Sequence, residues 1–298
     1  MATLYLVATP IGNLEDISAR ALRVLQEVAL IAAEDTRHTR KLLSRYEIEA
    51  HVIAYHEHNK LTRLEAVLLP LANGGDVALV SDAGTPAISD PGYELVQAVI
   101  AAGFAVVPIP GPCAAIAGLV GAGLPTDRFL FMGFPPRRSS ERQSWFGEVN
   151  TLAATLVLYE SPHRLADTLA DALAVLGNRQ AAVARELTKI HEQFVRGTLR
   201  EVLAHFAEGE IRGEIVLIIA GAERAVGRRP ARSIAEAQSA DASDDPAAAP
   251  DEAQIIARLR HLRADGMSGT QAAKLVAREW NLDRQEVYRV WTELEQRV

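Results

Sequence analysis

Two carboxylates and four backbone-setting residues share one short segment, VSDAGTPAISDPG at residues 80–92. It follows an apolar run, DVALV, which is typical of a strand buried on both faces. Gly permits positive φ and a close approach of backbone to ligand, and Pro fixes a loop before the ligand arrives. Asp82 directly follows the strand, so we expect it to face a ligand. Asp90 precedes Pro91 at an expected helix start, where a helix cap is the favoured role.

Two similar loops follow other apolar runs. ATPIGNLEDIS at 8–18 follows LYLVA, and PIPGPCAAIAGL at 108–119 follows AVVPI. In an open parallel sheet, ligands bind beyond the carboxyl ends of the strands, where such loops gather. None of the three loops contains Lys or Arg, which a polyphosphate would require. The sulfonium and ammonium of S-adenosylmethionine suit a carboxylate such as Asp82, so this molecule fits better.

Further polar clusters follow other expected strands. These are AEDTRHTRKLL at 33–43, YESPHRL at 159–165 and ARELTKIHEQ at 184–193, and the last two would face a cleft between domains. His56 and His58 are spaced two apart, but neither Cys nor a third clustered His supports them, so we expect no metal. Cys113, the single cysteine, lies in an apolar setting and is interpreted as a small buried residue.

The elements that position these loops alternate between strands and helices. Apolar runs of Val, Ile and Leu bounded by Gly and Pro predict a largely parallel α/β sheet in the first half, and TLVLYE, QAAVARE and GEIVLIIAG predict the strands of a second α/β unit. A length of 298 residues fits about two domains, and 49% apolar content with a net charge of -7 is ordinary for a globular protein. One cysteine and an N-terminus without a basic region favour the cytoplasm, and prolines interrupt the longest apolar stretch, so no membrane span is expected.

The composition changes near the C-terminus. Residues 227–250 are rich in Ala, Ser, Asp and Pro, which predicts a flexible linker. Residues 251–298 have apolar residues at helical spacing and predict three helices, with a helix-turn-helix around Trp280, Val287 and Trp291. We therefore divide the chain into α/β domains at 1–122 and 123–226, the linker, and a helical domain.

In combination, these segments resemble the motifs of the tetrapyrrole-methylase-like superfamily, and specifically its branch of 16S rRNA cytidine 2'-O-methyltransferases. The motifs ATPIGNLEDIS, AEDTRHT, SDAGTPAISDPG, PIPGPCAAIAGL, GFPPRR, ESPHRL and RELTKIHE occur in this order over roughly residues 3–222. Pro135 departs from the pattern, because the branch more often has Leu at this position. The C-terminal helices resemble the extension of that branch.

The resemblance implies a two-domain class III methyltransferase fold of the α/β class and a homodimer. It also implies S-adenosylmethionine in the cleft, released as S-adenosylhomocysteine, and a cytidine ribose of 16S rRNA or the small ribosomal subunit, near the decoding centre, as the substrate. By motif position, the implied cofactor-binding residues are Pro10, Ile11, Asp82, Thr85, Ala114, Ala115, Tyr159, Gly213, Glu214 and Ile215.

Methylation of a ribose hydroxyl requires positioning and a group that takes up its proton. The candidate catalytic residues are Glu34, Glu160, Glu186 and Lys189. The candidate RNA-binding residues are Arg37, Arg40, Arg164, Lys274, Arg284 and Arg289. Two alternatives remain: a tetrapyrrole (precorrin-type) methylase of the same fold, and a non-enzymatic regulator that senses a ligand and binds nucleic acid through the C-terminal helices.

Overall fold

The computed structural model describes residues 2–60, 62–207, 211–222, 252–264, 267–280 and 282–296. The chain forms two compact units, residues 1–227 and residues 228–298. The predicted linker at 227–250 lies outside the described residues.

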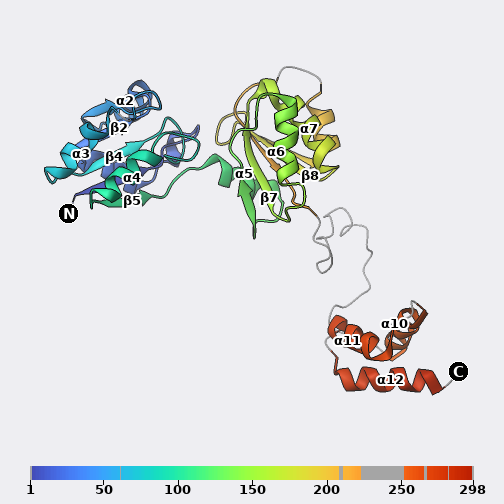
Figure 1. Cartoon of the computed structure of the whole chain (residues 1–298). Helices are drawn as coiled ribbons and strands as arrows, with labels where there is room; N and C mark the ends of the chain where they lie inside the picture. Colours follow the sequence, from blue (N-terminus) through green and yellow to red (C-terminus); the bar gives the residue numbers. More distant parts are fainter. Residues whose placement is uncertain are drawn as a thin grey trace. The chain divides into compact units, whose positions relative to one another are not determined.

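The first sheet is parallel, as the apolar runs predict, and has five strands, of which β3 was not predicted (Figure 1). Its order is β3-β2-β4-β1-β5, with bounds β1 Thr3–Val7, β2 Leu30–Ala33, β3 Val52–Ala54, β4 Val77–Val80 and β5 Ala105–Ile109. The carboxyl ends of β3, β2 and β4 are therefore neighbours along one edge, and the loops that leave them lie together.

Helices cover both faces of this sheet, which explains why β2 and β4 are apolar throughout and fully buried. On one face, α1 (Ala19–Glu27) and α2 (Thr36–Arg45) pack through Leu25 and Leu43. On the other, α3 (Leu64–Ala72) and α4 (Tyr93–Ala101) pack through Val67 and Leu95. The short helix η1 spans Leu14–Asp16.

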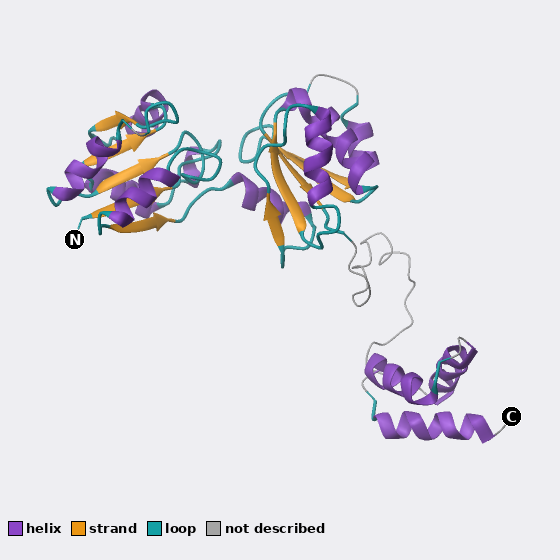
Figure 2. Ribbon diagram, viewed as in Figure 1, coloured by secondary structure: helices purple, strands orange, loops and turns teal. Residues whose placement is uncertain are grey.

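The second sheet is mixed and has the order β6-β7-β10-β8-β9 (Figure 2). Its strands are β6 Phe129–Phe131, β7 Thr155–Glu160, β8 Gln180–Arg185, β9 Gln193–Thr198 and β10 Ile215–Ile219. The central strand β10 runs antiparallel to both β7 and β8. The predicted strands at β7, β8 and β10 are confirmed, whereas β6 and β9 were not predicted.

Two layers of helices sandwich this sheet. On one face, the core is built on Phe146, Leu158 and Leu169, with α6 (Ser139–Glu148), α7 (Leu165–Leu176), α8 (Leu199–His205) and η2 (Pro162–Arg164). On the other, α5 (Ala114–Ala122) packs closely, since a Cβ on Gly118 would lie 3.0 Å from Cγ1 of Val216. Helix α5 follows β5 of the first sheet, so the loop before it crosses from one sheet to the other.

The unit at 228–298 contains α10 (Glu252–Ala264), α11 (Gly269–Trp280) and α12 (Arg284–Gln296). Leu259, Val276, Val287 and Trp291 form its core, and Trp280 packs against them partly buried. The three predicted helices and the predicted core are therefore confirmed. Among the described residues, no helix combines the length and apolar character needed to cross a bilayer.

Candidate functional site

A cavity of about 360 Å³ lies among the loops that the sequence singles out. Its lining includes Ile11 from the first loop, Gly84 and Thr85 from the second, and Ala114 from the third. Its remaining wall comes from the second α/β half, where Tyr159, Leu187, Gly213, Glu214 and Ile215 line it. Seven of the predicted cofactor-binding residues thus surround one cavity, whereas Pro10, Asp82 and Ala115 are not among its lining residues.

Hydrogen bonds fix the three loops to one another before any ligand binds. The backbone N–H of Thr9 donates to the carbonyl of Gly84 at 2.9 Å, and the N–H of Gly84 donates back at 3.0 Å. This bridge requires a φ of +86° at Gly84, which a residue with a side chain adopts only with strain. The Thr85 hydroxyl donates to the carbonyl of Pro112 at 3.0 Å. The cavity wall is therefore preorganised.

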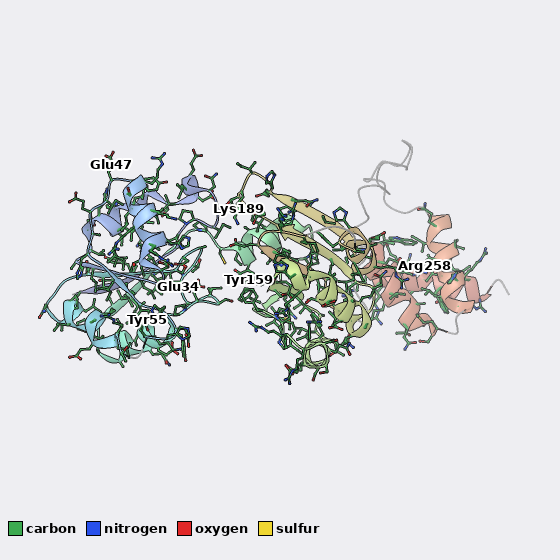
Figure 3. The ribbon with its side chains drawn as sticks, turned by 90° about the horizontal axis from the view of Figure 1, so that it is seen from above. Glu34, Glu47, Tyr55, Tyr159, Lys189 and Arg258 are labelled. Carbon is green, nitrogen blue, oxygen red and sulfur yellow. The ribbon has the colours of Figure 1, made fainter. Side chains whose placement is uncertain are left out.

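Tyr159, which is labelled in Figure 3, lines the cavity from the second α/β half. Its hydroxyl accepts a hydrogen bond from the N–H of Ala115 at 3.3 Å, and its ring packs against Phe131 and Phe134. Burial raises the pKa of Tyr159 to about 12, so the phenol stays neutral. Cys113 also lines the cavity and is only partly buried, so its interpretation as a small buried residue is wrong.

Asp90 is not the helix cap that the sequence suggested. The N-cap of α4 is Gly92, without a side-chain hydrogen bond, and Asp90 instead lines the cavity. Burial raises the pKa of Asp90 to about 6, and the negative charge of Glu34 adds to the effect. The sequence Asp90-Pro91 is typical of a helix start, but α4 begins only at Tyr93.

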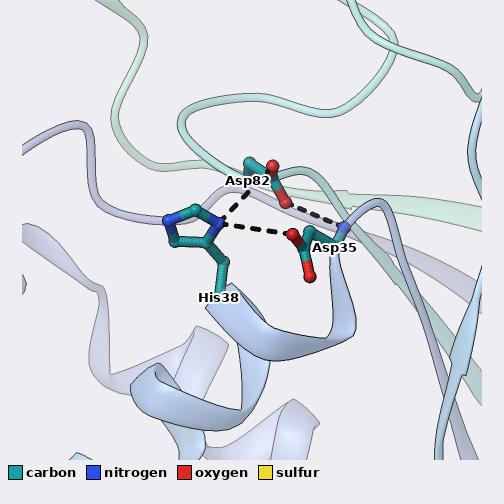
Figure 4. A group of neighbouring side chains, drawn as sticks. All are labelled: Asp35, His38 and Asp82. Atoms are coloured by element: carbon teal, nitrogen blue, oxygen red, sulfur yellow. Dashed lines mark hydrogen bonds and ion pairs between the residues drawn. The ribbon is translucent and has the colours of Figure 1, made fainter.

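Asp82 instead holds neighbouring loops together. Its carboxylate accepts a hydrogen bond from the N–H of Asp35 at 2.9 Å, and its own N–H donates to Glu34 at 3.4 Å. Asp35, His38 and Asp82 place their ligand atoms within 4.8 Å of one another (Figure 4). Asp35 is already engaged, because it caps α2 and pairs with Arg37 at 2.7 Å. These contacts account for the group without a metal.

The RELTK loop meets the first loop beside the cavity. A Cβ on Gly12 would lie 2.5 Å from Cγ of Lys189, so only glycine allows this contact. Lys189 pairs with Glu186 at 2.8 Å and with Glu214 at 3.2 Å, and Glu186 also accepts the N–H of Glu214. The hydrogen bond from Lys189 lowers the pKa of Glu186, so this carboxylate stays ionised. The cluster supports the cavity wall at Glu214.

Comparison with known proteins establishes the family. Residues 3–203 match the model of the Tetrapyrrole (Corrin/Porphyrin) Methylases. The chain belongs to this methylase family. Its fold resembles the methyltransferase CobJ, with a TM-score of 0.56, 19% identity and coverage of 76% of this chain and 98% of the other. It also resembles uroporphyrin-III-C-methyltransferase from Thermus thermophilus, with a TM-score of 0.52, 21% identity and coverage of 73% and 94%.

Curated relatives of this methylase share one name, ribosomal RNA small subunit methyltransferase I. The protein from Halalkalibacterium halodurans is 45% identical over 289 residues, 97% of this chain and 94% of its own length. The protein from Escherichia coli O157:H7 is 52% identical over 221 residues, 73% of this chain and 77% of its own length.

Glu160 of the methylase is enclosed, although it was a candidate base. Its carboxylate accepts hydrogen bonds from the Thr168 hydroxyl and the N–H of Ser161, and it pairs with Arg164 at 3.3 Å. Arg164 also donates to the carbonyls of Pro135 and Pro136. Both side chains therefore anchor the GFPPRR loop, which contains the atypical proline.

The other predicted RNA-binding residues are accessible. Arg37 and Arg40 lie on the solvent side of α2, although Arg37 is paired with Asp35. Lys274 on α11 and Arg284 and Arg289 on α12 are exposed as well. The described structure thus leaves five of the six predicted cations at the surface.

Proposed function

We propose that this methylase transfers a methyl group from S-adenosylmethionine to the ribose 2'-hydroxyl of a cytidine in 16S rRNA, near the decoding centre. The observation that carries the proposal is the cavity, which lies among the shared motifs of a chain that is 45% identical, over 97% of its length, to a ribosomal RNA small subunit methyltransferase I. The names of such relatives favour ribosomal RNA over a tetrapyrrole as substrate.

The side chains of the cavity fit S-adenosylmethionine. Asp90 and Glu214 place carboxyl groups at its wall, and no Lys or Arg is among the lining residues that the structure describes. This charge pattern suits a sulfonium and an ammonium and opposes a polyphosphate. Ile11, Ala114 and Ile215 supply apolar surface, and Thr85 and Tyr159 supply hydroxyls. S-adenosylmethionine would supply an electrophilic methyl group, and S-adenosylhomocysteine is the neutral product.

The protein's own contribution is to hold the two reactants in line. Positioning of this kind supplies about 7–11 kcal/mol of a reaction barrier. The fixed loops around Gly84 and Thr85 serve this purpose, since their backbone needs no reorganisation on binding. A hydroxyl is a poor nucleophile, so an acceptor for its proton is also required.

The exposed Lys and Arg side chains bind the RNA in this proposal. Lys274 lies on α11, and Arg284 and Arg289 lie on α12, in a folded helical unit with its own core, and cations of this kind contact phosphates. A homodimer is part of the proposal. Ile116 and Val120, four residues apart on one face of α5, are 44% and 67% exposed, which suits a contact with a second copy. The cytoplasm is the expected location, because ribosomal RNA is the substrate.

The decisive experiment is mass spectrometry of ribose-methylated nucleosides in 16S rRNA from cells with and without the gene. We expect 2'-O-methylcytidine to be lost from one position in the deletion strain and restored by the wild-type gene. An unchanged nucleoside profile would contradict the proposal. A change confined to tetrapyrroles would instead favour the precorrin-type alternative.

A further inference from the structure

Glu34 and His56 are two polar residues that do not line the cavity but follow neighbouring strands of the first sheet. Glu34 follows β2 and His56 follows β3, two neighbouring parallel strands, so both residues lie at the carboxyl edge of the first sheet. The Asp90 loop leaves β4, the next strand, and Glu34 is the charged residue that acts most strongly on Asp90. The pair therefore lies beside the cofactor cavity, on the side of the first α/β half.

The imidazole of His56 has an unused donor. Asn59 accepts the backbone N–H of His56 through Oδ1 at 2.8 Å, so its Nδ2 is a donor and faces the ring nitrogen Nε2 at 3.1 Å. Nε2 must then accept, and the neutral ring carries its proton on Nδ1. This nitrogen is buried and finds no partner among the described residues. A buried donor without an acceptor is unusual and indicates that a ligand completes the site.

The other candidate bases are unsuited to proton transfer. Glu160 is enclosed by Thr168, Ser161 and Arg164, and Glu186 is held ionised by Lys189. Glu34 is only half-buried, and burial raises its pKa, which makes it a stronger base than an ordinary carboxylate.

The groups that face Glu34 come from three segments. Asp82 and Asp90 belong to the loop after β4, Asp35 is its neighbour in the chain, and His56 follows β3. Burial raises the pKa of Glu34, the charges of Asp82 and Asp35 add to the rise, and the hydrogen bond from the Asp82 backbone opposes it.

We propose that Glu34 accepts the proton of the substrate hydroxyl and that His56 is a positioning residue for this step. The inference rests on the proposed function. The hydroxyl oxygen forms a bond to the methyl carbon, and the electron pair of the broken carbon–sulfur bond remains on sulfur. The hydroxyl proton passes to the carboxylate, so a cation and an anion are converted into two neutral groups. The Nδ1–H of His56 donates to the bound nucleotide and holds it against Glu34.

The test compares Glu34→Gln with Glu65→Gln, an exposed carboxylate on α3, in the full-length chain. Transfer of labelled methyl to small ribosomal subunits is measured at saturating cofactor, and the affinity for S-adenosylhomocysteine is measured by calorimetry. We expect Glu34→Gln to lower kcat by about 100-fold or more with the affinity retained, and Glu65→Gln to change neither. Wild-type turnover in Glu34→Gln would overturn the proposal. Absence of methyl transfer by the wild type would instead refute the proposed function.

The dependence of kcat on pH is the second measurement. It tests the proposal even if Glu34→Gln does not fold. In the wild type, kcat should fall at low pH as Glu34 is protonated; we call this fall the acid limb. The variant Glu34→Asp should keep the acid limb, with a lower kcat throughout. His56→Ala should raise KM for the subunit and leave the acid limb where it is, because the neutral imidazole positions the nucleotide and carries no charge that acts on Glu34. An acid limb that Glu34→Asp abolishes, or a KM that His56→Ala leaves unchanged, would contradict the assignment.

Discussion

The ionisation state of a single side chain, Asp90, changes the charge at the cavity wall. Asp90 is half-buried and lines the cavity, and burial raises its pKa to about 6. A raised pKa in an acid means that ionisation at neutral pH costs the folded protein stability, and a cationic ligand offsets this cost. We therefore expect Asp90 to lower the stability of the free protein and to strengthen the binding of a cationic ligand.

Replacement of this carboxyl separates the two effects. We expect Asp90→Asn to weaken binding of labelled S-adenosylmethionine in equilibrium dialysis by roughly 10- to 100-fold. At pH values above 7, the melting temperature of the variant should be higher than that of the wild type, because no buried charge has to form. In the wild type, affinity should fall as the pH drops below about 6, because protonation removes the charge. Asp127→Asn, at an exposed position, serves as the control. Equal affinity in Asp90→Asn and the wild type would show that Asp90 does not pair with the ligand.

Strands and loops set the geometry around these side chains, and the sequence revealed them unevenly. The strands β4, β5 and β7 were predictable because they are continuous apolar runs bounded by Gly, Pro or polar residues. The edge strands β6 and β9 are short or partly exposed, so their patterns are weak. Long-range contacts could not be predicted from the sequence either. No local pattern indicates that Gly12 contacts Lys189 or that Asp90 lines the cavity.

The contact between the first loop and the RELTK loop has a direct test. Gly12→Ala places a Cβ 2.5 Å from Cγ of Lys189 and 3.1 Å from the Leu187 carbonyl, and overpacking of this kind costs about 1–3 kcal/mol. We expect the loops to separate, with reduced methyl transfer and weaker cofactor binding but an intact fold by circular dichroism. Gly147→Ala is the matched control, since no atom lies within 4 Å of the added Cβ. Wild-type kinetics in Gly12→Ala would indicate that the loop contact is dispensable.

The whole molecule has two folded units, and we propose that one binds the cofactor and the other docks the RNA. The cavity is built within residues 1–227, and the helical unit has its own core around Trp291. Separate cores allow one unit to be altered without loss of the other.

This division predicts how substitutions in the helical unit act. Lys274→Ala, Arg284→Ala and Arg289→Ala together should weaken binding to small ribosomal subunits and flatten its dependence on salt, because phosphate contacts are lost. Affinity for S-adenosylhomocysteine should not change. Arg260→Ala, at an exposed position on α10, is the comparison. If removal of residues 240–298 leaves the affinity for subunits unaltered, the helical unit does not dock the RNA.

We propose that the preorganised cavity between the Asp90 loop and Tyr159 binds a methyl donor. Titration calorimetry of the folded, full-length chain with S-adenosylhomocysteine tests it most directly. We predict saturable heat with one site per chain, abolished by prior saturation with S-adenosylmethionine. Absence of any heat of binding from either compound, on well-folded protein, would show that the cavity does not bind the methyl donor.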